Sequence, residues 1–185
     1  MLRSAEKPSG KARLQEILAE LAATPERVVG ITTATLFRMI DGGTPEGAPI
    51  ALLIDEADAI FNAKSPSEAQ ENLRAILNVG YQRGQTVPRT VGQGTKIHVK
   101  RFRTFAPVCL AGIGRLPETI EDRSIVITLR RVKKVETIEK WRMNAGAEAA
   151  EPVRARMGDW AQATVERLKA GVDQERMPDE LGARA

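Results

Sequence analysis

The most constraining feature of the sequence is an apolar run that ends in a cluster of carboxylates. Residues 51–58 read A-L-L-I-D-E-A-D, so the aliphatic run leads directly into Asp55, Glu56 and Asp58. An unbroken aliphatic run is typical of a strand that is buried on both faces of a parallel sheet. Ligands bind beyond the carboxyl ends of such strands, so the cluster is a candidate site for a cation and a reaction. The alternative is an acidic helix start, because carboxylates also stabilise a first helical turn.

Helical and apolar stretches alternate along the rest of the chain. Helical spacing of apolar residues and start signals predict helices over 11–22, 33–40, from Ser65 onward, and from Val135 to about Gly171 with interruptions near Gly146 and Pro152. Apolar runs predict strands over 27–32, 49–54, 107–113 and 124–129. This order predicts an α/β fold with a parallel sheet. We divide the chain into a core, 1–132, and a helical, lid-like segment, 133–185.

Two short segments, 85–91 and 95–103, are separated by G-Q-G and predict an inserted β-hairpin. No Asp or Glu occurs between Glu71 and Glu118, whereas eight Lys and Arg residues do. Such a local excess favours a polyanion or an acidic partner surface. The candidate nucleic-acid contacts are Arg89, Lys96, Lys100, Arg101 and Arg103, with Lys96, His98 and Lys100 expected on one face of the second strand. The alternative is a solvated edge hairpin whose charges prevent aggregation.

The single cysteine, Cys109, excludes an internal disulfide and indicates a reducing compartment. With one Cys and one His, a zinc site is not expected, and Cys109 is interpreted as a core residue. No apolar run approaches the length of a membrane span. We therefore expect a soluble cytoplasmic protein that does not contact membranes.

A second chemical motif precedes the first helix. Residues 4–12 read S-A-E-K-P-S-G-K-A, and Gly10-Lys11 matches half of the four defining positions of a phosphate-binding P-loop. In that reading the backbone around Gly10 cradles phosphate and Lys11 reaches the terminal phosphates. Ala12 replaces the hydroxyl residue that would hold Mg²⁺, and Pro8 removes one backbone donor. The alternative is an ordinary loop and helix start.

The two motifs suggest roles at the carboxylate cluster and at one arginine. Asp55 would hold Mg²⁺, and Glu56 would orient and activate the attacking water, as in a Walker B strand. Arg123 precedes the predicted strand 124–129, where it could stabilise phosphoryl charge in a neighbouring subunit. On local evidence, a surface pairing of Arg123 with Glu121 or Asp122 is an equal alternative.

Taken in order, these segments resemble a AAA+ P-loop ATPase module. The chain is similar to a domain-of-unknown-function family found in actinobacteria and their phages and plasmids, often beside primase or helicase regions. The resemblance rests on S-A-E-K-x-S-G-K, L-L-I-D-E-A-D-A-I-F, L-R-A-I-L-N-V-G-Y-Q-R-G and A-P-V-C-L-A-G-I-G-R-L-P-E-T-I-E-D-R-S-I-V-I-T-L-R-R. It implies that Arg123 acts in trans, that the hairpin faces DNA, and that Arg154 or Arg156 senses nucleotide from the lid.

The chain departs from this family in several places. Besides Ala12 and Pro8, only Met1-Leu2-Arg3 precede Ser4, so the first strand is expected to be largely missing, with a gap at the centre of the sheet. A polar sensor residue is not evident in A-G-I-G, and the chain ends before the family's domain is expected to end. The sequence resembles a member shortened at both ends.

Three functions stay open from the sequence. The first is a AAA+-type protein linked to DNA replication, with weak or lost binding and hydrolysis of Mg²⁺-ATP. The second is a non-catalytic DNA-binding or regulatory subunit, as a homo-oligomer or within a ring of a related ATPase. The third is a remnant reading frame without a selected function.

Overall fold

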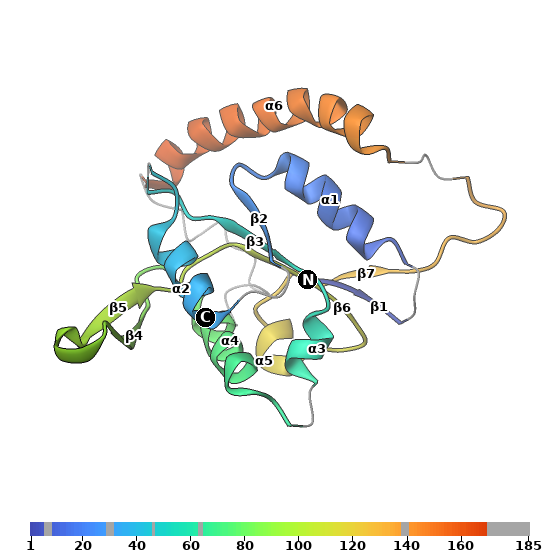
Figure 1. Ribbon diagram of the computed structural model, residues 1–185. Helices are drawn as coiled ribbons and strands as arrows, with labels where there is room; N and C mark the ends of the chain where they lie inside the picture. Colours follow the sequence, from blue (N-terminus) through green and yellow to red (C-terminus); the bar gives the residue numbers. More distant parts are fainter. Residues whose placement is uncertain (6–8, 29–31, 46, 63–64, 138–140, 170–185) are drawn as a thin grey trace, which may run out of the picture.

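Five parallel strands form the centre of the protein, as the computed structural model shows (Figure 1). The structure describes residues 1–5, 9–28, 32–45, 47–62, 65–137 and 141–169. The strand order is β2-β3-β6-β1-β7, and all pairings among these five strands are parallel. Their carboxyl ends therefore share one edge of the sheet, which we call the carboxyl edge. The strands are β1 (Leu2–Ser4), β2 (Pro25–Val28), β3 (Ala51–Ile54), β6 (Val108–Ile113) and β7 (Ile127–Leu129). The predicted α/β fold with a parallel sheet is confirmed.

The short β1 is an interior strand between β6 and β7, so the predicted gap in the sheet is wrong. Leu2 pairs with Ala111 of β6 on one side and with Ile127 of β7 on the other. Met1 extends the pairing, because its amino group donates to the carbonyl of Ile125 and its carbonyl accepts from Ile127, both at 2.8 Å. Three residues suffice to fill this place in the sheet, because the neighbouring β7 is equally short and β1 pairs with both β6 and β7.

Six helices accompany the sheet in the described part of the chain. They are α1 (Lys11–Leu21), α2 (Thr33–Gly42), α3 (Ala57–Phe61), α4 (Glu68–Val79), α5 (Glu118–Glu121) and α6 (Met143–Lys169). The predicted helix start at Ser65 is early, because α4 begins at Glu68, where Ser67 and Gln70 form a reciprocal capping box. α1 lies over one face of the sheet, and α3, α4 and α5 lie on the other side (Figure 1).

The predicted hairpin is present and packs against α2. It consists of β4 (Thr86–Val91) and β5 (His98–Arg103), joined through a short 3₁₀ turn at Gly94–Lys96. Phe102 is buried, and its ring centroid lies 5.7 Å from that of Phe37 in α2. This aromatic pair belongs to the main aliphatic core, so the base of the hairpin is fixed to the body of the protein.

The C-terminal part is a single helix that lies along α1 (Figure 1). The predicted interruptions at Gly146 and Pro152 are wrong, because α6 runs through both positions. The carbonyl one turn before Pro152 belongs to Glu148, an exposed residue, so it can accept from water in place of the hydrogen bond that proline cannot donate. The predicted helix also begins late, since residues 135–137 are not helical. None of the helices in the described ranges is long and apolar enough to cross a membrane.

Candidate functional site

Hydrogen bonds join α1 and the ends of three strands at the carboxyl edge. The carbonyl of Ser4 in β1 accepts from the N–H of Gly114, just after β6, at 3.0 Å. The N–H of Ile113 in β6 donates to Asp58 Oδ1 at 2.9 Å. The buried amide of Gln15 in α1 donates to the carbonyl of Ile54, the last residue of β3, at 3.0 Å. The residues that follow β1, β6 and β3 are therefore held in fixed relative positions.

Lys11 lies at the start of α1, in contact with the end of β1. Its ammonium group donates to the hydroxyl of Ser4 and, at 3.2 Å, to the hydroxyl of Ser9. Both partners are neutral, so no carboxylate offsets the charge of Lys11 through a described contact. Gly10, with φ of 80°, precedes the helix and supplies no side-chain cap. The first N–H groups of α1 and the Lys11 ammonium thus form a positive site suited to an anion.

Two positions of the P-loop motif do not add to this site. Ala12 carries no hydroxyl, so α1 offers no side-chain oxygen next to Lys11 as a metal ligand. Pro8 lies outside the described residues. Gly10 and Lys11 keep the residue types of the phosphate-binding part of the predicted motif, and Ala12 lacks the hydroxyl of its metal-binding part.

The three carboxylates after β3 have different positions. Asp58 accepts the N–H of Ile113, and Gly112 permits this approach, since a Cβ there would lie 3.0 Å from Asp58 Oδ1. Asp58 therefore fixes α3 to β6. Asp55 is exposed and accepts only the N–H of Glu56, at 2.8 Å, among its described contacts. The alternative of an acidic helix cap fits Asp58, whereas Asp55 stays available to a cation.

Glu56 has a strained backbone and an exposed side chain. Its φ is 54°, and no other non-glycine residue in the described ranges has a positive φ. The left-handed conformation costs an L-residue about 1–2 kcal/mol. The Glu56 carboxylate has no hydrogen bond or ion pair to any residue that the structure describes. Strain of this kind at a residue without a packing role is typical of a functional position.

The Gly10–Lys11 group and the Asp55–Glu56 pair lie near each other. They follow β1 and β3, which are separated only by β6, so about 10 Å separates the two strand ends. A chain of two or three phosphates could span that distance. Among the described residues, no three His, Cys, Asp or Glu side chains are grouped as a metal site. A cation at Asp55 would therefore complete its coordination with water and ligand oxygens.

Arg123 lies at the amino edge of the sheet, opposite the carboxyl edge where Lys11, Asp55 and Glu56 lie. With Met1 and Pro107, it lines a cavity at the amino ends of β1 and β6. Its guanidinium lies 4.5 Å from the centre of the Tyr81 ring and donates to the carbonyl of Asn78 at 3.2 Å. The structure does not bring Arg123 to Glu56 within one chain.

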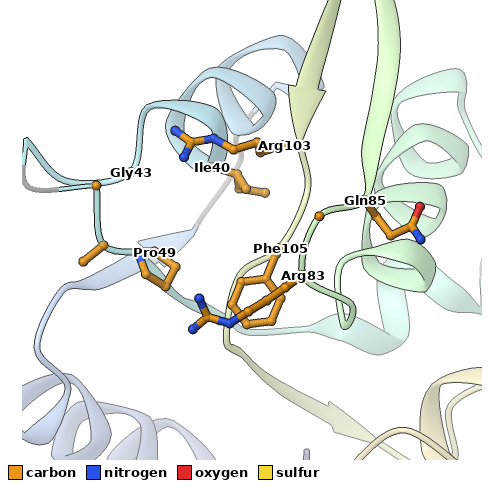
Figure 2. A pocket seen from close by; sticks show the side chains of 10 residues that line it. Ile40, Gly43, Pro49, Arg83, Gln85, Arg103 and Phe105 are labelled. Carbon is orange, nitrogen blue, oxygen red and sulfur yellow. The ribbon is translucent and has the colours of Figure 1, made fainter. Parts of the chain in front are cut away.

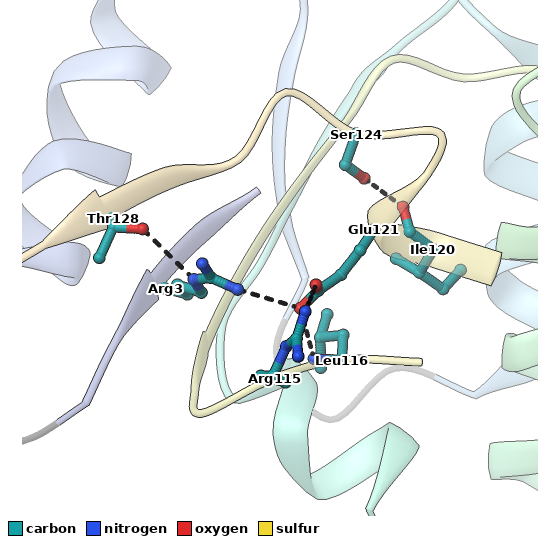
Figure 3. Close-up of polar contacts among 7 residues, drawn as sticks. All are labelled: Arg3, Arg115, Leu116, Ile120, Glu121, Ser124 and Thr128. Carbon is teal, nitrogen blue, oxygen red and sulfur yellow. Dashed lines mark hydrogen bonds and ion pairs between the residues drawn. The ribbon is translucent and has the colours of Figure 1, made fainter. Parts of the chain in front are cut away.

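The alternative pairing of Arg123 with Glu121 is also not seen. Glu121 instead accepts from Arg3 of β1 at 3.3 Å and pairs with Arg115 at 3.4 Å (Figure 3). Its carboxylate also accepts the N–H of Leu116 at 3.2 Å. Glu121 thus fixes α5 and the segment after β6 to β1, next to Ser4.

Arg154 lies at the far end of α1 from Lys11. It donates to the carbonyl of Glu20 at 3.3 Å and pairs with Glu151. Nine residues separate Glu20 from Lys11 along α1, which corresponds to about 14 Å. The structure therefore does not place Arg154 at the candidate phosphate site.

The hairpin arginines and lysines fall into two groups. Arg89 and Lys100 share the face of buried Phe102, so both point toward the body of the protein. Arg89 donates to Asn72 at 2.8 Å, and Lys100 pairs with Asp41 at 2.9 Å. Asp41 also pairs with Arg103 at 3.6 Å. Only Lys96 and Arg101 have no side-chain hydrogen bond or ion pair within the described part of the chain.

Asp41 is the carboxylate that holds the base of the hairpin. Burial alone would raise its pKa, but the hydrogen bonds from Lys100 and from the Arg103 backbone, with their positive charges, lower that pKa below its ordinary value. Lys96 also differs from its predicted place, because it lies in the turn and not on the strand face with His98 and Lys100. The predicted basic face is therefore largely paired.

Sequence reasoning missed two residues that build the site, Ser4 and Gln15, and did not distinguish the structural role of Asp58 from that of Asp55. Ser4 was read as part of a loop, because a three-residue strand gives no periodic signal. Gln15 is only 3% exposed, and a polar residue within an otherwise helical stripe gives no indication of burial.

No protein-family model matches the chain, and no curated protein sequence matches it.

Proposed function

We propose that the protein is a AAA+-type nucleotide-binding protein that binds the phosphates of ATP at the start of α1 and hydrolyses it slowly or not at all. The observation that carries this proposal is the position of Lys11. Its ammonium donates to two neutral hydroxyls beside the first N–H groups of α1. Lys11 follows β1 and Asp55 follows β3, and only β6 lies between these two strands. A cation placed among helix N–H groups at the carboxyl edge of a parallel sheet suits a chain of phosphates.

The sheet order supports the same proposal. The AAA+ resemblance implies a central first strand that leads into the phosphate loop, and β1 is an interior strand next to the central β6 that ends at Ser4, before Gly10. The inserted hairpin and the C-terminal helix also occur in the implied order. Arg154 departs from it, because a lid residue that contacts nucleotide would have to lie near Lys11.

Weak hydrolysis is proposed on the basis of the metal ligands. Mg²⁺ would offset the phosphate charge when bound, and Asp55 is the residue suited to hold it. Ala12 supplies no second fixed ligand, so the ion would be poorly positioned. Glu56 is exposed beside Asp55 and would orient the attacking water.

Arg123 fits this proposal only between chains. Because it lies at the amino ends of the strands, it could reach phosphate only in a neighbouring copy or in a related ATPase subunit. If so, adding this protein should stimulate or inhibit a partner ATPase, and Arg123→Ala should abolish that effect. An unchanged effect of the variant would exclude the trans role.

The main test is ATP binding measured by calorimetry on the wild type and on Lys11→Ala. We expect Lys11→Ala to weaken binding about tenfold or more, since a charge-assisted contact to phosphate is lost. Lys96→Ala is the matched control, because it removes the same charge from the exposed hairpin turn. Equal affinity of wild type and Lys11→Ala, or no binding by the wild type, would contradict the proposal.

A second candidate function is nucleic-acid binding by the hairpin. Lys96 and Arg101 are exposed and without charge partners among the described residues, and Ile97 and Val99 beside them are 61% and 68% exposed. Exposed cations beside apolar side chains suit a single strand, which offers both phosphates and unstacked bases. Charge reversal of Lys96 and Arg101 should abolish salt-dependent binding of an oligonucleotide; binding that survives it would reject the hairpin surface.

A further inference from the structure

A cavity of about 360 Å³ lies between α2, α4 and the hairpin. Its apolar lining includes Phe37, Phe102, Val91 and Ala34, and its polar lining includes the guanidinium-bearing Arg38 and Arg89. Among the residues that the structure describes, no Asp or Glu lines it. The volume is within the usual range for pockets that hold a small organic ligand. The cavity is separate from the Lys11 site, because α2 and the hairpin contribute nothing to the contacts of Lys11.

Arg89 is held in place within this cavity. Its guanidinium donates to Asn72 Oδ1 at 2.8 Å and lies 4.9 Å from the centre of the Phe37 ring. Asn72 is uncharged, so the positive charge of Arg89 is oriented but not neutralised. A guanidinium that is already oriented loses little side-chain entropy when it binds an anion.

Arg38 is the second cation of the cavity and is exposed. It has no side-chain hydrogen bond or ion pair to the residues that the structure describes. Two guanidinium groups that line one cavity without a carboxylate favour a ligand that carries a phosphate-like anion. The apolar lining favours a ligand with an apolar or planar body beside that anion.

A second, smaller cavity at the C-terminal end of α2 shows what is particular about this one. It measures about 150 Å³ and is lined by Arg83, Arg103 and Phe105 (Figure 2). There Arg103 is paired with Asp41, and Arg83 lies 4.5 Å from the centre of the Phe105 ring. Since its arginine charge is partly offset and its volume is smaller, it is less suited to an anionic ligand.

We propose that the larger cavity binds a nucleotide unit, with Arg38 and Arg89 on the phosphate and the base or sugar against Phe37, Phe102 and Val91. A free mononucleotide and a residue of a single strand present the same chemistry. The inference deepens the second candidate function and does not depend on nucleotide binding at Lys11.

The test is fluorescence anisotropy with a labelled twelve-residue oligothymidylate, with thymidine monophosphate as a competitor, at constant salt. We expect Arg38→Ala to weaken binding about tenfold, as for the loss of one charge-assisted phosphate contact. Ala34→Trp should weaken binding similarly, because it fills the cavity without changing the charge. Arg83→Ala is the matched control, which removes one arginine from the smaller cavity and should change affinity less than about twofold.

The outcomes separate the sources and the alternatives. If thymidine monophosphate competes and responds to the same variants, a free nucleotide is sufficient for binding. If it does not compete, the ligand is the single strand. Both outcomes support the cavity. Three results would overturn the proposed cavity site. These are equal losses of affinity for Arg38→Ala and Arg83→Ala, no effect of Ala34→Trp on affinity, or no binding of either probe. Binding that is lost only in Lys96→Glu with Arg101→Glu would place the strand on the hairpin and reject the cavity. Lys11→Ala should leave this binding unchanged, whether or not ATP binds at α1.

Discussion

The carboxyl edge of the sheet and the hairpin differ in how much of their charge is available. At the carboxyl edge the motif is incomplete, yet Lys11 has only neutral partners and the Asp55 and Glu56 carboxylates are exposed. At the hairpin the basic run is intact in the sequence, yet Lys100 and Arg103 share Asp41. A count of charges in a sequence therefore overestimates the charge that a folded surface offers to a ligand.

The same difference separates structural from functional carboxylates. Asp58 and Asp41 each accept hydrogen bonds from a distant segment, so they contribute to stability. Glu56 contributes nothing comparable and has an unfavourable backbone conformation. If the comparison is right, the first two residues stabilise the fold and the third does not.

The largest expected effect is on Asp58. Asp58→Ala removes the acceptor of the Ile113 N–H at the carboxyl edge and should lower the free energy of unfolding by about 2 kcal/mol. Asp55→Ala is the matched control and should lower it by less than about 0.5 kcal/mol. Urea denaturation measures both. Equal losses would show that Asp55 is as structural as Asp58.

A smaller effect of opposite sign is expected at Glu56. Glu56→Gly relieves the left-handed backbone at φ of 54° and should raise the free energy of unfolding by about 1 kcal/mol, less the extra entropy of glycine in the unfolded chain. Glu56→Ala keeps the strain and should leave stability near that of the wild type. Thermal and urea unfolding give the two values; a destabilised glycine variant would mean that Glu56 has a structural role.

The smallest effect is expected at Asp41 and depends on pH. The pKa of this carboxyl is lowered in the folded protein, so its stabilising contribution is present above its unfolded pKa near 4 and is lost as the pH falls through the lower folded value. At neutral pH, Asp41→Asn should lower the free energy of unfolding by about 0.5–1 kcal/mol, since its partners Lys100 and Arg103 are half-exposed or more.

The stability curves of wild type and Asp41→Asn should converge at pH values below the lowered folded pKa of Asp41, where this carboxyl is protonated in both states. The same variant frees two hairpin cations, so its affinity for an oligonucleotide should rise a few fold at neutral pH. A constant difference in stability between pH 3 and pH 7 would show that the charge of Asp41 is not what holds the hairpin.

The sequence predicted most of the sheet because its strands are continuous apolar runs. Leu52 and Ile54, for example, are both nearly inaccessible, as expected for a doubly covered strand. β1 could not be predicted, since three residues carry no period and their pairing partners lie more than a hundred residues away. The unbroken α6 was missed because helix propensities overestimate how strongly a proline at an exposed position interrupts a helix.

The candidate site was predictable only in its residue types. Lys11, Asp55 and Glu56 follow from motifs, and the parallel sheet brings their strands to one edge. The structural role of Asp58 and the position of Arg154 near Glu20 of α1 both depend on contacts between distant segments. The sequence alone does not indicate such contacts. The neutralisation of Lys100 by Asp41 is of the same kind, because the two residues meet only after the hairpin packs on α2.

The most direct test of the account is an ATP titration with and without Mg²⁺ on the wild type and on Ala12→Thr. Lys11 is the proposed phosphate-binding cation, and the next residue, Ala12, carries no hydroxyl that could hold a metal. We therefore predict that wild-type affinity changes less than about threefold when Mg²⁺ is chelated, and that Ala12→Thr gains an affinity that requires Mg²⁺. Wild-type binding that is lost without Mg²⁺, or the absence of binding in both conditions, would contradict it.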